Sequence, residues 1–375
     1  MVVLCVSGGG LKSATWTMQV VRRADSLLNG ALLEHTVLIT GASGGMLGMG
    51  YLRELYLRKQ QGADINIYDK QYIDNITKDL VNSIAFTIIS NDLFLPWTTF
   101  EVGGYTYQKD RGYIFEQQLN ENTGYILDKT IADYRIAEQE ATIPMLYFTP
   151  SIINDARRLV ISPQGATFMM VAPVGVRIPQ AAEVDVVDFQ WLFKNQGADD
   201  LRMLTAMRMN ASYPYVLPTV HLPSTPAIEL IDAGFLDNYG ILAATRFIQV
   251  YQDWIKENTS GVVLLQISCS QRIEEIGKGG GKGAIESLFN PLGIIGKVME
   301  KQEYEQDNSL GFIYDILGDD YFNVIRFIYR PTSEGQLEAA ISFHITEREK
   351  EDILRAIDLP ANIAGLRQLQ QLMPQ

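Results

Sequence analysis

A serine lies in a glycine-rich turn near the N-terminus, where its neighbours could support nucleophilic chemistry. Val37 to Thr40 predict a buried strand, and Gly41 to Gly45 (G-A-S-G-G) lead from it into a stretch that predicts a helix. A sharp strand-to-helix turn with Ser43 at its apex is a G-x-S-x-G nucleophile elbow, whose apical side chain is expected to be exposed. Free N–H groups at the helix start favour developing negative charge. The turn therefore predicts that Ser43 attacks a carbonyl.

The same turn is typical of two other kinds of site. It could be a glycine-rich loop that binds phosphate, although no G-K-[ST] follows any glycine run of the chain. It also matches the nicotinamide-binding start of short-chain dehydrogenases, but Leu47 stands where that site needs a glycine. A dehydrogenase further requires a Y-x-x-x-K pair on a helix. Tyr105 and Lys109 have the spacing, but they lie in a glycine-flanked stretch that does not predict a helix.

A triple glycine follows the first predicted strand, Val2 to Val6, and precedes a helix predicted from Ala14 to about Asn29, with Gly30 as its stop. Consecutive glycines let the backbone turn several N–H groups toward one anion. Two successive strand-helix units place both loops at the carboxyl edge of adjacent parallel strands. We therefore expect an oxyanion hole beside Ser43, made by Gly8, Gly9 and Gly10 together with Gly44.

With these motifs the chain resembles the patatin-like phospholipases and the related cytosolic phospholipase A2 catalytic domains. The matches are G-G-G-L-K at Gly8 to Lys12, G-A-S-G-G at Gly41 to Gly45, and D-A-G at Asp232 to Gly234. The resemblance implies a catalytic dyad of Ser43 and Asp232. It also implies supporting roles for Lys12, which replaces the commoner arginine, and for Asn238, just beyond the aspartate.

In such a dyad Asp232 acts directly as the general base. A carboxylate with an ordinary pKa is a poor base for a hydroxyl, so we expect the site to be desolvated and that pKa raised. An apolar segment, Ser83 to Phe100, could line an acyl pocket or belong to the core. Chain order also permits a triad of Ser43, Asp232 and His344, but His344 lies in an alternating late strand, which favours the dyad.

Lys12 has three open roles. Near the start of the helix after the triple glycine, its ammonium could attract a lipid phosphate, brace the oxyanion loop through a carboxylate, or remain at the surface. Because a lone lysine on a chain of charge −13 says little about an anionic substrate, bracing is favoured.

Composition restricts the partners. Of 375 residues, 47% are hydrophobic and 20% are charged, and the net charge is −13 with no basic block, which argues against nucleic acid as a partner. Cys5 and Cys269 lie in apolar runs and predict reduced, buried side chains. No cluster with metal-ligand spacing occurs, so we expect a hydrolase that requires neither metal nor cofactor.

No apolar run reaches the length of a membrane span. We expect a cytoplasmic protein that acts on lipid or acyl-ester substrates and meets a membrane only peripherally; its abrupt start is typical of a chain trimmed upstream.

The expected architecture is one three-layer α/β/α domain over residues 1–375, patatin-like, with a mainly parallel central sheet. Its core covers about 1–270, and a C-terminal extension covers about 271–375. We expect a helix from Gly240 to about Thr259, a hairpin of Tyr321 to Tyr329 with Leu337 to Ile345, and a final helix capped by Thr346 and Glu349. A family member that binds lipid without catalysis remains the alternative to the enzyme.

Overall fold

Five buried strands build a parallel sheet at the centre of the computed structural model, which describes residues 1–80, 99–102, 105–108, 110–170, 184–213, 217–270, 304–332 and 342–373. The strand order is β12-β11-β1-β2-β5, and every neighbouring pair is parallel. The strands are β1 (Val2–Val6), β2 (Thr36–Gly41), β5 (Met145–Phe148), β11 (Val262–Ser268) and β12 (Phe322–Ile328). The predicted mainly parallel α/β sheet is confirmed.

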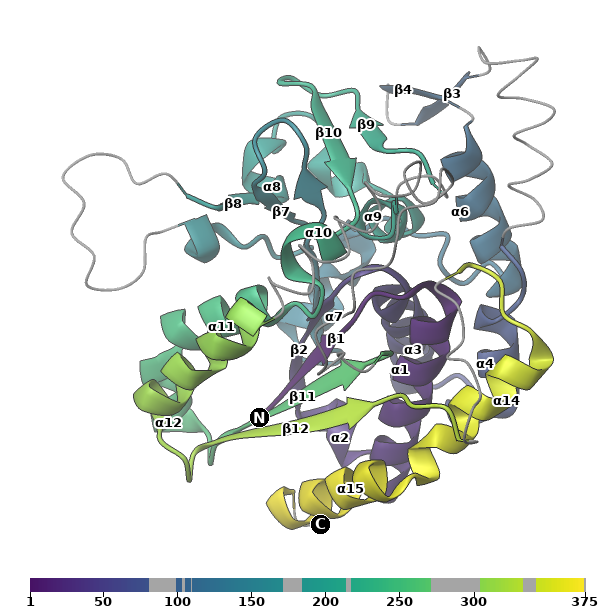
Figure 1. Cartoon of the computed structure of the whole chain (residues 1–375). Helices are drawn as coiled ribbons and strands as arrows, with labels where there is room; N and C mark the ends of the chain where they lie inside the picture. Colours follow the sequence, from purple (N-terminus) through teal and green to yellow (C-terminus); the bar gives the residue numbers. More distant parts are fainter. Residues whose placement is uncertain are drawn as a thin grey trace, which may run out of the picture.

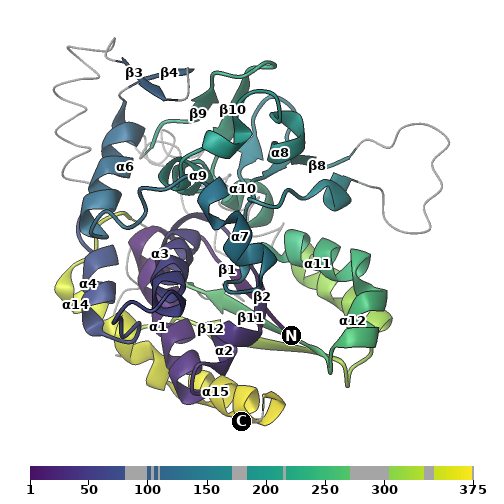
Figure 2. The same cartoon turned by 180° about the vertical axis from the view of Figure 1, so that it is seen from behind.

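Helices cover both faces of this sheet because successive side chains of a strand point to opposite faces. Val2, Leu4 and Val6 of β1 join one apolar cluster, and Val3 and Cys5 join another. Figures 1 and 2 show α1 and α3 on one side of the sheet and α11 and α12 on the other. The helices of these two layers are α1 (Gly10–Leu27), α2 (Ala31–His35), α3 (Ser43–Gln60), α4 (Lys70–Ile76), α11 (Ile241–Val250), α12 (Gln252–Asn258), α14 (Glu347–Arg355) and α15 (Pro360–Leu372).

A second, mixed sheet was not predicted from the sequence. Its order is β8-β7-β6-β10-β9, and only β7 and β8 are parallel neighbours. In Figure 1, β10 runs down from this sheet toward the carboxyl ends of β1 and β2. The strands are β6 (Ser151–Ile152), β7 (Arg158–Val160), β8 (Val186–Asp188), β9 (Val220–Leu222) and β10 (Ile228–Ile231). The catalytic loop expected after β10 therefore descends onto the parallel sheet instead of extending it.

The remaining described elements surround the second sheet. A two-stranded hairpin joins β3 (Thr99–Val102) to β4 (Tyr105–Gln108). The helices here are α6 (Arg111–Asn122), α7 (Arg135–Gln139), α8 (Phe189–Leu192), α9 (Met203–Asn210) and α10 (Gly234–Asp237), with 3₁₀ turns at Ala132–Tyr134, Thr167–Met170 and Ala198–Asp200. Elsewhere a helix spans 304–317, and a further 3₁₀ turn spans Ala356–Asp358.

Several predicted boundaries differ from the structure. Helix α1 begins at Gly10, four residues earlier than expected, because the positive φ angles of Gly9 and Gly10 turn the chain over these two residues. The helix predicted from Gly240 is divided into α11 and α12. The predicted C-terminal hairpin does not form over its described part: β12 pairs in parallel with β11, and Ser342 bridges Gly10, while residues 337–341 of the second segment lie outside the described residues. The capping box at the start of α14 is confirmed.

Candidate active site

The elbow forms where it was predicted, with Ser43 as the first residue of α3 and a φ of 48°. Small residues are required around it, since a Cβ at Gly44 would lie 1.8 Å from the Gly10 carbonyl oxygen and one at Gly41 would lie 2.1 Å from that of Val6. Ser43 itself is only 6% exposed, so the prediction of an exposed side chain is wrong. The reason is that neighbouring loops cover it; Gly8, for example, lies so close that a Cβ there would be 3.2 Å from Ser43 Cβ.

Asp232 follows β10 and lies beside Ser43 in the interior. The carboxyl is buried, and its Oδ1 accepts a hydrogen bond of 2.8 Å from the N–H of Gly234. Burial raises the pKa of Asp232 to about 7, while the N–H of Gly234 and the hydroxyl of Ser43 lower it. Within the described residues no hydrogen bond of full geometry reaches Oδ2. The Ser43 hydroxyl is thus close enough to the carboxyl to lower its pKa.

The triple glycine is held from both sides at Gly8. Its N–H donates to Asn238, to Oδ1 at 3.0 Å and to the carbonyl at 3.2 Å. Its carbonyl accepts the hydroxyl of Ser7 at 3.1 Å and the thiol of Cys269 at 2.9 Å. Gly8 was predicted to donate to an oxyanion, but the structure gives its N–H to Asn238. Asn238 therefore joins the aspartate loop to the glycine loop.

Gly9 and Gly10 keep their N–H groups available. Neither N–H forms a hydrogen bond within the described part of the chain. Both positions require glycine: a Cβ at Gly9 would lie 2.2 Å from Cys269 Sγ, and one at Gly10 would lie 2.2 Å from the Ser342 carbonyl oxygen. That carbonyl also accepts the N–H of Leu11 at 2.8 Å. Residues far along the chain thus fix the loop, and no local sequence signal indicated them.

Asn210 is a buried residue that the sequence did not identify as part of the site. Its Oδ1 accepts the N–H of Thr149 at 2.7 Å, and its Nδ2 donates to the carbonyl of Gly41 at 3.0 Å. Its own carbonyl accepts the N–H of Ala233 at 3.3 Å. The only signal was its place at the end of a predicted amphipathic helix, just before the small residues that precede Asp232. Asn210 therefore bonds to the end of β2, the end of β5 and the aspartate loop.

Lys12 lies in the first turns of α1 and is 2% exposed, which excludes a surface lysine. Its ammonium nitrogen lies 6.0 Å from the centroid of the Tyr329 ring. Tyr329, the residue after β12, therefore lies near this charge, which follows the glycine loop by two positions in the sequence.

The structure does not support the catalytic triad or the dehydrogenase site. His344 is exposed, and its Nδ1 lies 3.0 Å from Asp79 Oδ2, whereas Asp232 is buried, which argues against the triad. A dehydrogenase would need Tyr105 and Lys109 on one helix, but Tyr105 lies on strand β4. Lys109 lies outside the described residues.

Both cysteines are buried and free of disulfides. In the described ranges no group of histidine, cysteine, aspartate and glutamate side chains could hold a metal ion. Among the described helices, none has the length and apolarity to cross a bilayer.

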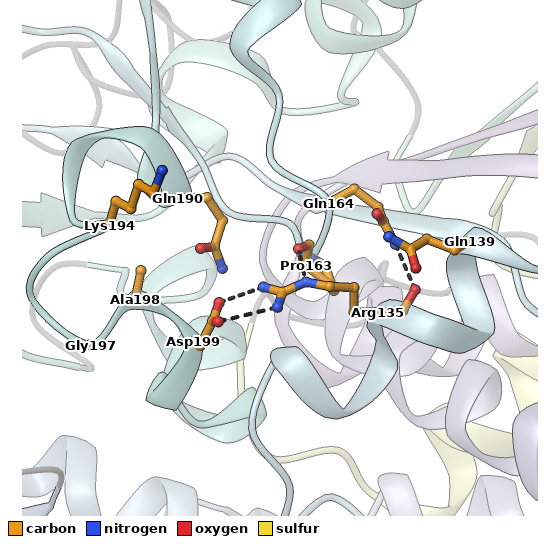
Figure 3. Close-up of a pocket in the computed structure, with 9 residues that line it drawn as sticks. All are labelled: Arg135, Gln139, Pro163, Gln164, Gln190, Lys194, Gly197, Ala198 and Asp199. Carbon is orange, nitrogen blue, oxygen red and sulfur yellow. Dashed lines mark hydrogen bonds and ion pairs between the residues drawn. The ribbon is translucent and has the colours of Figure 1, made fainter.

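A polar cavity of about 470 Å³ is lined by neither Ser43 nor Asp232. Figure 3 shows Arg135 extended across it toward Asp199, with which it forms an ion pair. Gln164 donates to the Arg135 carbonyl from the same wall. Arg135 thus bonds to both Asp199 and Gln164 across this cavity. The apolar segment proposed to line an acyl pocket falls, over residues 83–98, outside the described residues.

Comparison with known proteins gives one family match. The model of the patatin-like phospholipase family matches residues 4–245. No curated protein matches the chain. Among solved structures, human GIVD cytosolic phospholipase A2 in complex with methyl gamma-linolenyl fluorophosphonate is 12% identical with a TM-score of 0.47, over 100% of this chain and 59% of that one. VipD from Legionella pneumophila is 10% identical with a TM-score of 0.37, over 99% of this chain and 66% of that one. The chain therefore spans less than two thirds of their lengths.

Proposed function

Because the chain belongs to the patatin-like phospholipase family, we propose that it is a lipid acyl hydrolase that cleaves acyl esters through a Ser43–Asp232 dyad. The observation that carries the proposal is the burial of Asp232 beside a serine at the apex of a strand-to-helix elbow. A carboxyl whose pKa is raised to about 7 is a far better base than an ordinary aspartate, and at neutral pH part of it is still ionised.

The first half of the reaction forms an acyl-enzyme. Asp232 takes the hydroxyl proton of Ser43 through Oδ2, which accepts no other hydrogen bond from the described residues. Ser43 Oγ then bonds to the ester carbonyl carbon, whose π electrons move to the oxygen. When the tetrahedral intermediate collapses, the bond to the alcohol oxygen breaks and the proton on Asp232 passes to that oxygen.

The developing oxyanion is bound by the N–H groups of Gly9 and Gly10, aided by Gly44 at the start of α3. The peptide between Gly8 and Gly9 is planar and trans, so its carbonyl and the Gly9 N–H point in opposite directions. By accepting from Cys269 and Ser7, the Gly8 carbonyl fixes the direction of the donor. One such donor is typically worth about 3–4 kcal/mol of transition-state stabilisation.

The second half releases the acid. Asp232 is again ionised and takes a proton from a water molecule. The water oxygen attacks the carbonyl carbon of the acyl-enzyme, and the same oxyanion hole binds the carbonyl oxygen as it becomes negative. Collapse breaks the bond to Ser43 Oγ, and Asp232 returns the proton to the serine. In this scheme Asn238 holds the glycine loop against the aspartate loop and Lys12 braces it from behind. The partner is a lipid or acyl ester, met peripherally at a membrane surface.

Hydrolysis of p-nitrophenyl acyl esters by the wild type, Ser43→Ala and Ser162→Ala tests the proposal. Ser162 is a buried serine outside the site and serves as the matched control. We expect Ser43→Ala to lose at least about a thousandfold in kcat/KM and Ser162→Ala to keep a near-normal rate. A folded wild type without turnover would instead indicate a family member that binds lipid without catalysis. Substantial activity in Ser43→Ala would refute the elbow assignment.

A further inference from the structure

The two proposed catalytic groups come from distant parts of the chain, and their relative position must be set by something between them. Ser43 is fixed by the end of β2, whereas Asp232 follows β10 of the second sheet. These strands belong to different sheets and share no backbone ladder. Catalysis between such groups depends on a separation held to a fraction of an ångström.

Asn210 bonds to both parts at once. Its Nδ2 donates to the carbonyl of Gly41, two residues before Ser43. Its backbone carbonyl accepts the N–H of Ala233, the residue after Asp232. The side chain is fully buried, and its Oδ1 is held by the N–H of Thr149 beyond β5. Both ends of this amide therefore bond to backbone, the nitrogen to the carbonyl of Gly41 and the oxygen to the N–H of Thr149.

We infer that Asn210 is a positioning residue, which sets the distance between Ser43 and Asp232 without touching the substrate. The inference rests on the proposed function and names a determinant of its rate. The end of α9 is itself anchored, since Ser212 donates to the carbonyl of Arg208 at 2.7 Å and accepts the N–H of Asp232 at 3.2 Å through its own carbonyl. A rigid helix end thus carries the amide that joins the elbow strand to the aspartate loop.

The chain contains a matched control in Asn362. This asparagine is also buried, and its amide bridges backbone in the same way: it exchanges two hydrogen bonds of 3.2 Å with Ile328 and donates to the carbonyl of Ala356 at 2.8 Å. Asn362 lies on α15 and supports β12, one of the two edge strands of the described central sheet. Replacement of either asparagine by alanine leaves buried backbone groups unpaired, so both variants should be destabilised.

The test compares kcat, KM and melting temperature for the wild type, Asn210→Ala and Asn362→Ala on one p-nitrophenyl acyl ester. We expect both variants to melt at lower temperature. Only Asn210→Ala should lose kcat, by about 10- to 100-fold with KM nearly unchanged, because misplacement by about 1 Å can cost that much. Its rate of labelling by an alkyl fluorophosphonate should fall by a similar factor. If Asn210→Ala does not accumulate as folded protein, Asn210→Ser and Asn362→Ser are compared on the same terms.

An Asn210 variant whose kcat and labelling rate match those of the Asn362 variant would overturn the inference and leave the proposed function intact. A loss confined to KM would also overturn it, because the residue would then act on substrate binding. A wild type that neither turns over ester nor accepts the label would remove the proposed function, and the inference with it.

Discussion

Replacement of Asp232 by asparagine should make the protein more stable while it removes activity. Asparagine keeps the shape of the side chain, and its oxygen can still accept the N–H of Gly234. Its amide nitrogen replaces Oδ2, which accepts no hydrogen bond from the described residues, and it can donate to Ser43. The change therefore removes a buried negative charge, while one of the two new N–H donors can bond to Ser43.

The size of the effect follows from the pKa of the carboxyl. Burial raises it from 3.8 to about 7, a shift of about three units, and one unit corresponds to about 1.4 kcal/mol. Because the folded state holds this proton more tightly than the unfolded state, wild-type stability falls as pH rises from about 4 to about 7 and stays lower above that. The Asp232→Asn variant has no carboxyl at this position, so its stability does not fall with pH for this reason. We expect it to be more stable by up to about 4 kcal/mol above pH 7 and nearly equal to the wild type near pH 4.

Urea unfolding of both proteins, followed by tryptophan fluorescence from about pH 4.5 to 8.5, measures this difference. Other buried acids cancel in the comparison; Glu138, whose pKa burial also raises to about 7, is present in both. The hydrolytic rate of the variant should fall by about 10⁴, as for other isosteric losses of a base or its partner. A stability difference that does not change with pH, or a variant less stable than the wild type at pH 8, would refute the reasoning.

Three further predictions follow from the same geometry. The kcat/KM of the wild type should rise with pH to a plateau above about 7, since Asp232 must be ionised to act; a pH-rate profile whose acid limb lies near 4 would contradict this. Gly44→Ala should lower kcat by at least about 100-fold, because its Cβ would meet the Gly10 carbonyl oxygen at 1.8 Å, whereas Gly311→Ala, with open space around it, should leave the rate unchanged. His344→Ala should keep a near-normal rate in the same ester assay, and a loss as large as that of Ser43→Ala would restore the triad.

The local motifs could be predicted because their causes are local. Short apolar runs bounded by small, glycine-rich turns predicted β1, β2 and the elbow at Ser43. The capping box of Thr346 and Glu349 is equally local. These features depend on neighbours within four or five positions, which the sequence displays directly.

Features that depend on distant partners could not be predicted. The burial of Ser43 depends on which loops cover the elbow, and the loss of the Gly8 N–H as a donor depends on Asn238, which lies far along the chain. The role of Asn210 depends on backbone groups of Gly41 and Thr149, and a backbone acceptor has no sequence signature. The second sheet was not predicted because its short strands pair with residues far along the chain, as β6 does with β10 and β7 with β8.

The most direct test of the dyad is covalent labelling with an alkyl fluorophosphonate, which reacts with an activated serine, followed by mass spectrometry of the peptides. The account predicts one adduct for each chain, on Ser43, absent in Ser43→Ala and formed far more slowly in Asp232→Asn. An adduct on another serine, or labelling of Ser43 at an equal rate without the Asp232 carboxylate, would contradict it.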